Sequence, residues 1–261
     1  MTYRYYNSGS PTFFKSTKNQ LIDEFQANLT ANFANASTYQ TIQEEQVFGS
    51  GSLVNINCRV DRAVSSITGT LLGDDFKSIL FSDISHVSGL GKKYYFDDNY
   101  WIVTFSEKIK NLASSVTVRR CNNQLRWTNT SGSYLSEPCS VEPMVNRPTD
   151  SSGTTNPVEI EGFIRLYTQL NDRTANIKEG NRFLFGTPDN RHAFMVYGAG
   201  VRNWSNQKTS QDDSGSLLQL VLGANYVNEE TDDVTLGIAD INKVVYSIST
   251  NISGSISGSA T

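Results

Sequence analysis

Short apolar runs separated by turn-forming residues constrain the fold of this chain more than any other feature. Residues 94–96 and 100–105 are apolar or aromatic apart from Thr104, and Asp97, Asp98 and Asn99 lie between them. Asp and Asn accept the left-handed backbone of a tight loop better than most residues do. The pattern predicts a β-hairpin with a three-residue loop at positions 97–99.

The same pattern predicts two further hairpins. Residues 116–128 are expected to form one around a two-residue turn of Asn122 and Asn123, and residues 181–198 another around a turn at 187–190. About a dozen short strands of this kind indicate a mainly β fold. We expect a β-sandwich or barrel-like body built from hairpins.

One N-terminal amphipathic helix is predicted at residues 16–33. Thr17 can cap it, and Gln20 follows three residues later in the spacing of a capping box. Such a helix packs either on its own domain or on a neighbouring subunit, and both alternatives stay open. The apolar residues at helical spacing along one face are Leu21, Ile22, Phe25 and Leu29.

The chain is expected to divide into five parts. They are an arm and helix at 1–45, a β region at 46–145, a loop or linker at 146–157, a second β region at 158–249 and a flexible Ser/Gly tail at 250–261. The polar segment 146–157, rich in Ser, Thr and Pro, sets the central boundary. The aromatic residues predicted to fill the core are Trp101, Trp127, Phe183, Phe185 and Phe194.

Charge argues against several functional classes. The net charge is −4 and no run of Lys or Arg occurs, whereas nucleic-acid binders and polybasic membrane-binding segments carry basic patches. No apolar run approaches the roughly 18 residues that span a bilayer, so no membrane contact is expected. The first residues lack the apolar core of a secretory signal, which predicts a protein made in the cytoplasm.

No motif of a catalytic or cofactor site is present. The sequence lacks a P-loop, a GxGxxG fingerprint, a GxSxG elbow and an HExxH pair. The two histidines, His86 and His192, are predicted to be surface or ladder residues. We therefore expect no catalytic, cofactor-binding or metal-binding residues, no cofactor and no enzymatic activity.

The three cysteines leave two interpretations open. Cys58, Cys121 and Cys139 are too widely spaced for a zinc site, and an odd number does not make a disulfide framework. Three buried, reduced thiols are the favoured interpretation. The alternative is a bridge between Cys121 and Cys139 across neighbouring strands.

Acidic residues gather in several short clusters. Turn formation accounts for Asp97 and Asp98, and further acidic clusters lie at residues 212–213 and 228–233. A solvated loop is predicted for residues 228–233, and a cation site is the alternative. Trp204 lies in a polar stretch and is the tryptophan predicted to contact a partner chain.

Two stretches of the sequence carry a resemblance to a known family. The first is residues 96–103, FDDNYWIV, followed by residues 118–127, VRRCNNQLRW. The second is residues 167–174, YTQLNDRT, followed by 182–186, RFLFG, with Phe194, Met195 and Val196 beyond it. Together they resemble head-closure or head–tail connector (neck) proteins of tailed bacteriophages of Gram-positive hosts, over roughly residues 15–245.

The resemblance implies a structural virion protein that assembles with itself in the neck. Its partners would be further copies in a ring of about six or twelve, a portal or adaptor protein, and tail proteins. DNA would pass through the lumen without specific binding, which suits the acidic balance because like charges repel. The alternatives are a tail-tube, tail-terminator or baseplate protein, or a glycan-binding host-adsorption module that stacks sugars on tryptophan.

Overall fold

The computed structural model describes residues 17–64, 71–83, 86, 88–109, 113–129, 132–146, 158–201 and 216–241. The fold is mainly β, as predicted, and the α-helix α1 (Thr17–Ala34) precedes all of the strands. The strands are β1 (Tyr39–Glu45), β2 (Leu53–Arg62), β3 (Phe76–Phe81), β4 (Lys93–Phe96), β5 (Asn99–Ile109), β6 (Ala113–Arg120), β7 (Asn123–Thr128), β8 (Tyr134–Asn146), β9 (Val158–Leu170), β10 (Arg182–Thr187), β11 (Asn190–Val201) and β12 (Ser216–Asn225). A single 3-10 turn, η1 (Thr174–Asn176), lies between β9 and β10.

The first six strands form a closed barrel, here called the first barrel. Its order is β1-β2-β3-β6-β5-β4, and β4 pairs again with β1 to close the ring of strands. Successive side chains of a strand point to opposite faces, so alternate residues fill the interior. Ile79 of β3 and Val118 of β6 are fully buried there, and the rings of Phe96 and Trp101 stack with centroids 4.8 Å apart.

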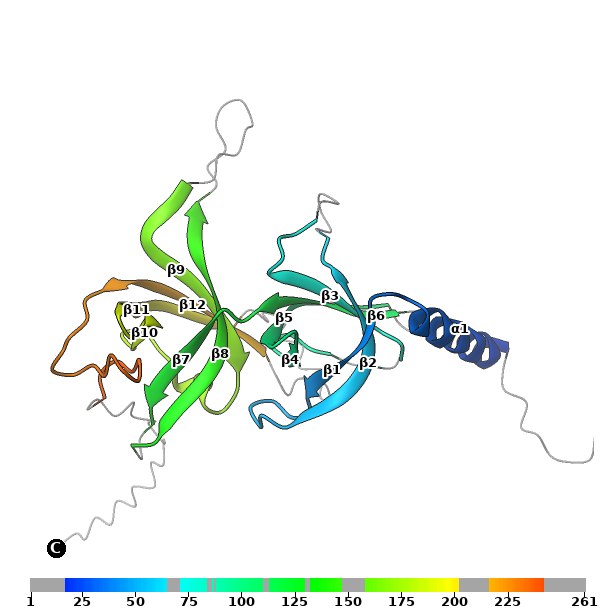
Figure 1. Cartoon of the computed structure of the whole chain (residues 1–261), viewed down its shortest axis with the longest axis horizontal. Helices are drawn as coiled ribbons and strands as arrows, with labels where there is room; N and C mark the ends of the chain where they lie inside the picture. The colour runs from blue at the N-terminus through cyan, green and yellow to red at the C-terminus, as the bar shows by residue number, and fades with distance from the viewer. Residues whose placement is uncertain are drawn as a thin grey trace, which may run out of the picture.

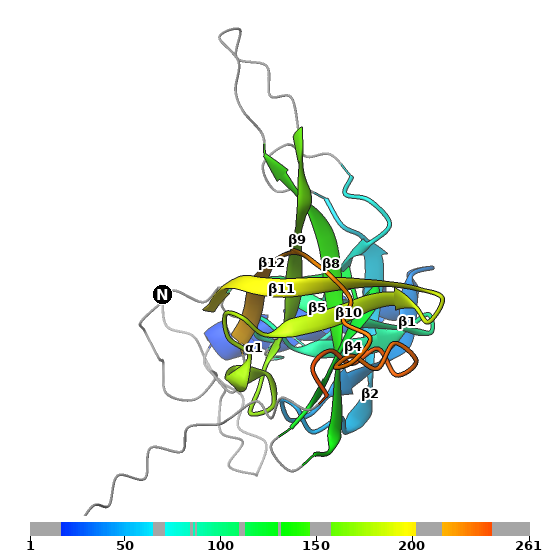
Figure 2. The same cartoon turned by 90° about the vertical axis from the view of Figure 1, so that its left-hand side faces the viewer.

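The last six strands form a barrel-like sheet, here called the second barrel. Its order is β10-β11-β12-β9-β8-β7. The two outer strands contribute to one core, in which Leu125 and Trp127 of β7 belong to the same cluster as Phe183 and Phe185 of β10. The two barrels lie side by side along the long axis, and α1 projects from the end of the first barrel that faces away from the second (Figure 1). Strands β8 and β9 continue together beyond the body of the second barrel (Figure 2).

The predicted core is largely confirmed. Trp101, Trp127, Phe183 and Phe185 are all buried, with exposed fractions between 2% and 6%. Phe194 is only partly buried, and it packs against the core of the second barrel.

The first predicted hairpin exists, but its loop is shorter than expected. Phe96 pairs with Asn99, so the loop consists of Asp97 and Asp98 alone. Both have left-handed backbones, with φ of 49° and 56°. Two consecutive residues of this kind make a primed turn, which matches the twist of the flanking strands. The third predicted hairpin is likewise confirmed with a two-residue loop, because Thr187 pairs with Asn190.

The second predicted hairpin is wrong. Strands β6 and β7 do not pair, because β6 belongs to the first barrel and β7 to the second. Asn122 does not form a turn between paired strands. Its side-chain amide donates to the carbonyl of Val141 at 2.9 Å and accepts from the N–H of Val141 at 2.8 Å. Cys121 and Asn122 are therefore the crossing between the two barrels.

The division between the sheets also differs from the expected boundary at 146–157. Strands β8 and β9 lie on either side of that segment in the chain and pair with each other, with Asn146 opposite Val158. The change of sheet occurs earlier, between Arg120 and Asn123. A polar, Pro-containing segment has the same composition whether it joins two domains or two strands of one sheet, which explains the difference.

The predicted helix is present over nearly the expected range, ending at Ala34. Phe33 near its end is buried, and the Arg59 guanidinium lies over the Phe33 ring, 5.6 Å from its centroid. Closer to the start, the side-chain amide of Gln26 donates to the carbonyl of Ser82. These contacts hold the C-terminal half of α1 against the end of the first barrel.

Candidate functional site

Buried charges hold the two barrels together at their junction. Nζ of Lys93 on β4 lies 3.2 Å from Oε1 of Glu45 on β1 and 2.6 Å from Oε1 of Glu137 on β8. All three residues are buried. A buried cation between two carboxylates is stable only where the geometry satisfies it, so the arrangement favours one relative position of the barrels.

Gln169 extends this polar junction and satisfies its whole side-chain amide. Its nitrogen donates to Oε2 of Glu45 at 2.6 Å and to the carbonyl of Gly91 at 3.0 Å. Its oxygen accepts from the N–H of Gly49 at 2.8 Å and from the Asn171 amide at 3.0 Å. Since Gln169 lies on β9 of the second barrel, each contact with residues 45, 49 and 91 crosses the junction.

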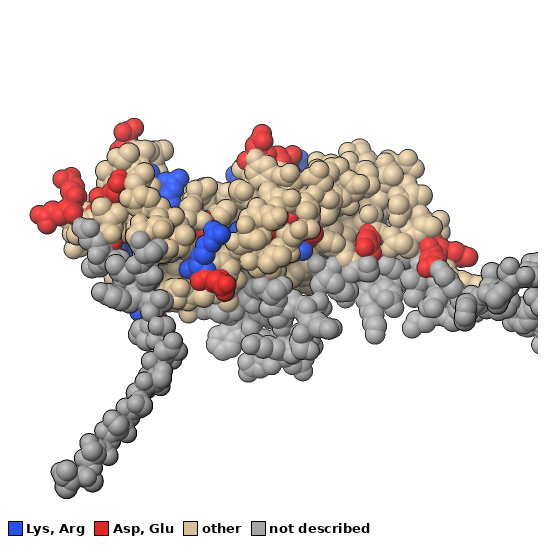
Figure 3. Space-filling model, turned by 90° about the horizontal axis from the view of Figure 1, so that it is seen from below, with Lys and Arg blue, Asp and Glu red and all other residues tan. Residues whose placement is uncertain are grey.

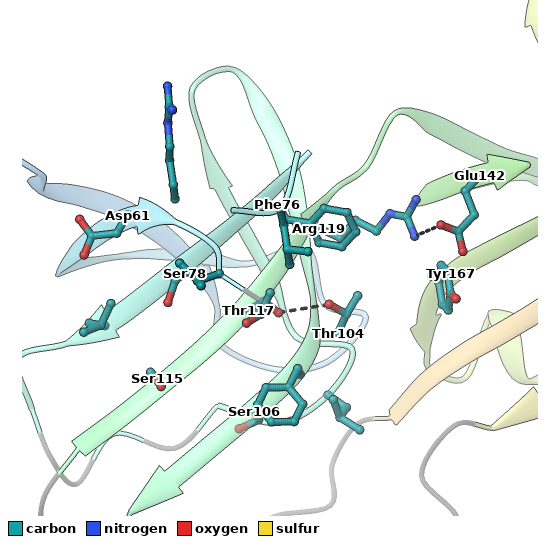
Figure 4. A pocket seen from close by; sticks show the side chains of 16 residues that line it. Asp61, Phe76, Ser78, Thr104, Ser106, Ser115, Thr117, Arg119, Glu142 and Tyr167 are labelled. Atoms are coloured by element: carbon teal, nitrogen blue, oxygen red, sulfur yellow. Dashed lines mark hydrogen bonds and ion pairs between the residues drawn. The ribbon is translucent and has the colours of Figure 1, made fainter. Parts of the chain in front are cut away.

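An apolar patch and a stacked arginine complete the junction. Ile102 of the first barrel packs with Tyr167 and Leu217 of the second in one buried cluster. Beside them the Arg119 guanidinium lies between two rings, 5.0 Å from the centroid of Phe76 and 5.3 Å from that of Tyr167. Arg119 also pairs with Glu142 of β8 at 2.6 Å (Figure 4).

A second polar cluster surrounds Glu44, next to the junction. Oε1 of Glu44 accepts from the Tyr94 hydroxyl at 2.8 Å and lies 2.9 Å from Nε2 of His86 and 2.8 Å from Nζ of Lys92. Burial alone would raise the pKa of Glu44, but the hydrogen bonds and charges of His86 and Lys92 outweigh it and lower the pKa. The carboxylate is therefore held in its charged form and is a poor proton acceptor.

This cluster contains a serine, a histidine and a glutamate, but not in the order that nucleophilic catalysis needs. A nucleophile must lie within reach of its base. The hydroxyl of Ser88 instead contacts the Tyr94 hydroxyl at 2.7 Å. The pKa of Tyr94 is raised well above its ordinary value, mainly by burial and then by the charge of Glu44. The arrangement ties the segment before β4 to β1, and the absence of catalytic activity stays a prediction.

The two histidines occupy different environments. His192 is exposed and stands in a strand ladder opposite Phe185, as predicted. His86 is not simply a surface residue, because it pairs with Glu44 and its ring stacks on Phe81 with centroids 4.0 Å apart. The correction arises from a contact across 42 positions of sequence, which local pattern does not reveal.

The prediction of a solvated loop at 228–233 is wrong for Asp232. Asp232 is 7% exposed, and its carboxylate pairs with the Arg182 guanidinium at 2.9 Å. It also accepts from the backbone N–H groups of Asn228 and Asp240, each at 2.9 Å. The Arg182 guanidinium supplies the positive charge beside the Asp232 carboxylate, in the position where a metal cation would bind. The ion pair between Arg182 and Asp232 therefore holds this loop against the second barrel.

The cysteines agree with the favoured interpretation in most respects. All three thiols are free, Cys58 and Cys139 are fully buried, and Cys121 is partly buried. Burial raises the pKa of Cys58 and of Cys121 to about 12 in each case. The thiolate is the reactive form, so these side chains are chemically quiet.

A groove of about 970 Å³ opens on the outer face of the first barrel, beside the second. Its floor is formed by outward-facing residues of β3, β5 and β6, and Glu142 and Tyr167 of the second barrel close one end (Figure 4). Its lining includes the apolar residues Val64, Leu72, Phe76, Leu80, Leu90 and Phe105. The residues that line the groove come from both barrels.

The described acidic clusters do not form a metal site. No group of three or more His, Cys, Asp or Glu side chains in the described segments is placed to hold a metal ion. Within those same segments, no helix has the length and apolar character to cross a membrane. Trp204, Asp212 and Asp213 lie outside the described residues.

Comparisons with protein families, with curated proteins and with solved structures found no match.

The junction residues Lys93, Glu137 and Gln169 were not predicted from the sequence. One signal was available, since Lys93 directly precedes the aromatic run of β4 and a lysine inside such a strand needs a buried partner.

Proposed function

We propose that this protein is a structural virion protein of a tailed phage, a ring subunit of the neck that joins the portal to the tail. In this role it is made in the bacterial host cytoplasm, assembles into the virion and lets the genome pass through a central lumen. The resemblance of residues 96–127 and 167–196 to head-closure and connector proteins supports the assignment.

The structural observation that supports it most is the buried junction between the barrels. A connector has to hold one partner in a fixed position relative to another. The contacts of Lys93 with Glu137, and of Gln169 with Glu45, favour a single arrangement of the two barrels. A buried polar network of this kind adds orientation where an apolar contact alone would permit sliding.

Surface charge is compatible with a conduit for DNA. Figure 3 shows charged side chains of both signs scattered over a mostly uncharged face. Glu229 and Glu230 are exposed on the loop that Asp232 anchors. Acidic groups of this kind would repel DNA if the loop faces the lumen.

The other candidate functions are weighed by the same observations. A tail-tube, tail-terminator or baseplate protein would use a rigid pair of barrels equally well, and only its position in the virion differs. The glycan-binding alternative loses two of its three candidate tryptophans, because Trp101 and Trp127 are buried and cannot stack on a sugar.

Electron cryomicroscopy of intact virions, together with native mass spectrometry of the released neck, tests the proposal. We expect a closed ring of about six or twelve copies between portal and tail. A single copy per particle, or absence of the chain from virions, would contradict the assignment. A ring found along the tail or at the baseplate would move the protein to the second candidate.

A further inference from the structure

A second pocket, of about 330 Å³, lies where the chain crosses between the barrels. It shares no lining residue with the groove and is here called the crossing pocket. Asp98 and Tyr100 line it from the first barrel, and Arg126 of β7 and Arg191 of β11 line it from the second. The lining also includes the amide side chains of Asn99, Asn122, Asn123 and Gln124.

The two arginines of this pocket are held side by side. Nη1 of Arg126 donates to the carbonyl of Leu236 at 3.2 Å, and Nη2 of Arg191 donates to the carbonyl of the preceding residue, Thr235, at 3.5 Å. Burial, followed by the positive charge of Arg126, lowers the pKa of Arg191. The two guanidiniums therefore repel each other, and the fold keeps them together against that repulsion.

Neither guanidinium is neutralised by an ion pair within the described part of the chain. Arg191 also donates through Nε to the carbonyl of Val234 at 2.9 Å and through Nη1 to the carbonyl of Gly186. All of these acceptors carry no net charge, and the same is true of the acceptors of Arg126. Arg182 differs, because it pairs with the carboxylate of Asp232.

The backbone around Arg191 is shaped to hold its guanidinium in one position. Gly237 has a left-handed backbone with φ of 72°, and a Cβ atom at this position would lie 2.8 Å from Cζ of Arg191. A side chain at position 237 would thus displace the guanidinium. Donors that are already fixed in place lose little conformational entropy when a ligand binds.

The pocket retains hydrogen-bond donors that the protein does not use. Each Nη atom of an arginine carries two N–H groups, so both guanidiniums keep donors beyond those bonded to carbonyls. The side-chain oxygen of Gln124 accepts from the Ser136 hydroxyl at 3.0 Å, whereas its amide nitrogen has no partner among the described residues. Asp98 is the one carboxylate of the described lining, so two positive charges face one negative charge.

We propose that the crossing pocket binds a free phosphate ion, held by Arg126 and Arg191. Guanidinium groups recognise the oxygens of phosphate and carboxylate through paired hydrogen bonds. Two guanidiniums on different strands can contact different oxygens of a tetrahedral phosphate, whereas a planar carboxylate fits a single guanidinium. A volume of about 330 Å³ is near the lower limit of small-molecule sites and suits one small ion. The inference does not depend on the proposed ring.

Nuclear magnetic resonance of the full chain, labelled with ¹⁵N at arginine, tests the site. Sodium phosphate is titrated in near neutral pH and compared with sodium chloride at equal ionic strength. We expect the Nε–H signals of Arg126 and Arg191 to shift along a saturable curve with phosphate and to stay in place with chloride. Shifts that do not saturate, or that chloride reproduces, would overturn the proposal.

Calorimetric titration of variants tests the same assignment. Arg126→Gln should weaken phosphate binding at least about tenfold, because it removes charge-assisted hydrogen bonds. Arg173→Gln is the matched control and should leave the affinity unchanged, since Arg173 likewise donates to a backbone carbonyl, that of Gly49, but lies outside the pocket. Equal effects of the two substitutions would overturn the proposal.

Asp98→Asn should change the affinity in the opposite direction. It removes the negative charge from the lining, and Asn tolerates the left-handed backbone of this position, where φ is 56°. We expect phosphate to bind about threefold more tightly, and weaker binding would count against the proposal. This variant and the titration of the wild type decide the question even if Arg126→Gln fails to fold.

Two further ligands distinguish a free phosphate ion from other oxyanions. Acetate should bind at least about fivefold more weakly than phosphate, because it offers one planar pair of oxygens. A short oligonucleotide carries phosphate groups on a polymer and should not displace free phosphate from the two arginines. Acetate that binds as tightly as phosphate, or an oligonucleotide that displaces it, would overturn the assignment to a free phosphate ion.

Discussion

Nζ of Lys93 lies 2.6 Å from Oε1 of Glu137, and this contact joins a strand of the first barrel to a strand of the second. Lys93→Met would leave the carboxylates of Glu137 and Glu45 buried without their cation. We expect the free energy of unfolding to fall by about 3–5 kcal/mol, as for other broken buried pairs. Urea denaturation measures the loss. Lys178→Met, at an exposed lysine, is the matched control and should change the value by less than about 0.5 kcal/mol.

Truncation of core aromatics should be costly in the second barrel. Trp127 and Phe185 are 6% and 5% exposed and belong to one cluster. Trp127→Ala and Phe185→Ala should each lower the free energy of unfolding by about 3–5 kcal/mol, because each leaves a cavity. Tyr134→Ala, at a side chain that is 61% exposed, should have little effect. Unchanged melting temperatures for both core variants would show that this cluster does not stabilise the fold.

Asp232 should make stability depend on pH in the acid range. Burial alone would raise its pKa, but the N–H groups of Asn228 and Asp240 and the Arg182 guanidinium together lower the pKa below its ordinary value of 3.8. A carboxyl group with a depressed pKa stabilises the fold above its unfolded pKa, and the effect is lost as pH falls through the folded pKa. Asp232→Asn should therefore cost about 2–3 kcal/mol at pH 7.

The difference between the wild type and Asp232→Asn should shrink as pH falls below 3.8. Unfolding free energies measured from pH 7 to pH 3 check this. Glu229→Gln, at an exposed carboxylate of the same loop, should show no such convergence. A difference in unfolding free energy between the two proteins that stays constant down to the lowest pH would show that the charge of Asp232 does not stabilise the fold.

The acidic loop can be probed without disturbing its anchor. Glu229→Lys with Glu230→Lys should leave folding intact because both side chains are exposed, whereas Asp232 has to stay unchanged. The wild-type protein should bind DNA no more tightly than roughly 10⁻⁴ M at physiological salt. If the loop faces the lumen, the double variant should assemble normally and impair genome retention or ejection.

Gel-shift and fluorescence titrations measure the affinity for DNA. Micromolar, salt-sensitive binding of DNA by the wild-type protein would contradict the proposal that DNA passes through the lumen without being bound. Normal ejection by the double variant would place the loop on the outside of the ring while leaving the neck assignment untouched.

Strand pattern was enough to predict the fold class and most of the core, because alternation depends only on neighbouring residues. Trp101 and Phe183 could be identified in this way. Phe105 shows the limit, since one extra residue at Thr104 reverses every following side chain and leaves no local signature.

Pairing between distant segments could not be predicted from local signals. Asn122 and Asn123 have the same turn propensity whether the flanking strands pair or separate. In this chain the flanking strands separate, and the backbone of Val141 gives Asn122 both a donor and an acceptor. Similarly, the burial of Asp232 depends on Arg182, which is 50 positions away.

The crossing at Cys121 and Asn122 has a mechanical consequence. The crossing contains no slack segment between β6 and β7. Tension along the long axis would therefore act directly on the backbone hydrogen bonds of these two strands. The N–H of Cys121 bonds to the carbonyl of Tyr100 at 2.8 Å, and Asn122 is bonded to β8. Force would thus pass directly from the hydrogen bonds of β6 to those of β7. The buried ion pairs of Lys93 at the junction would carry part of the same force. We therefore expect the pair of barrels to resist extension along the long axis.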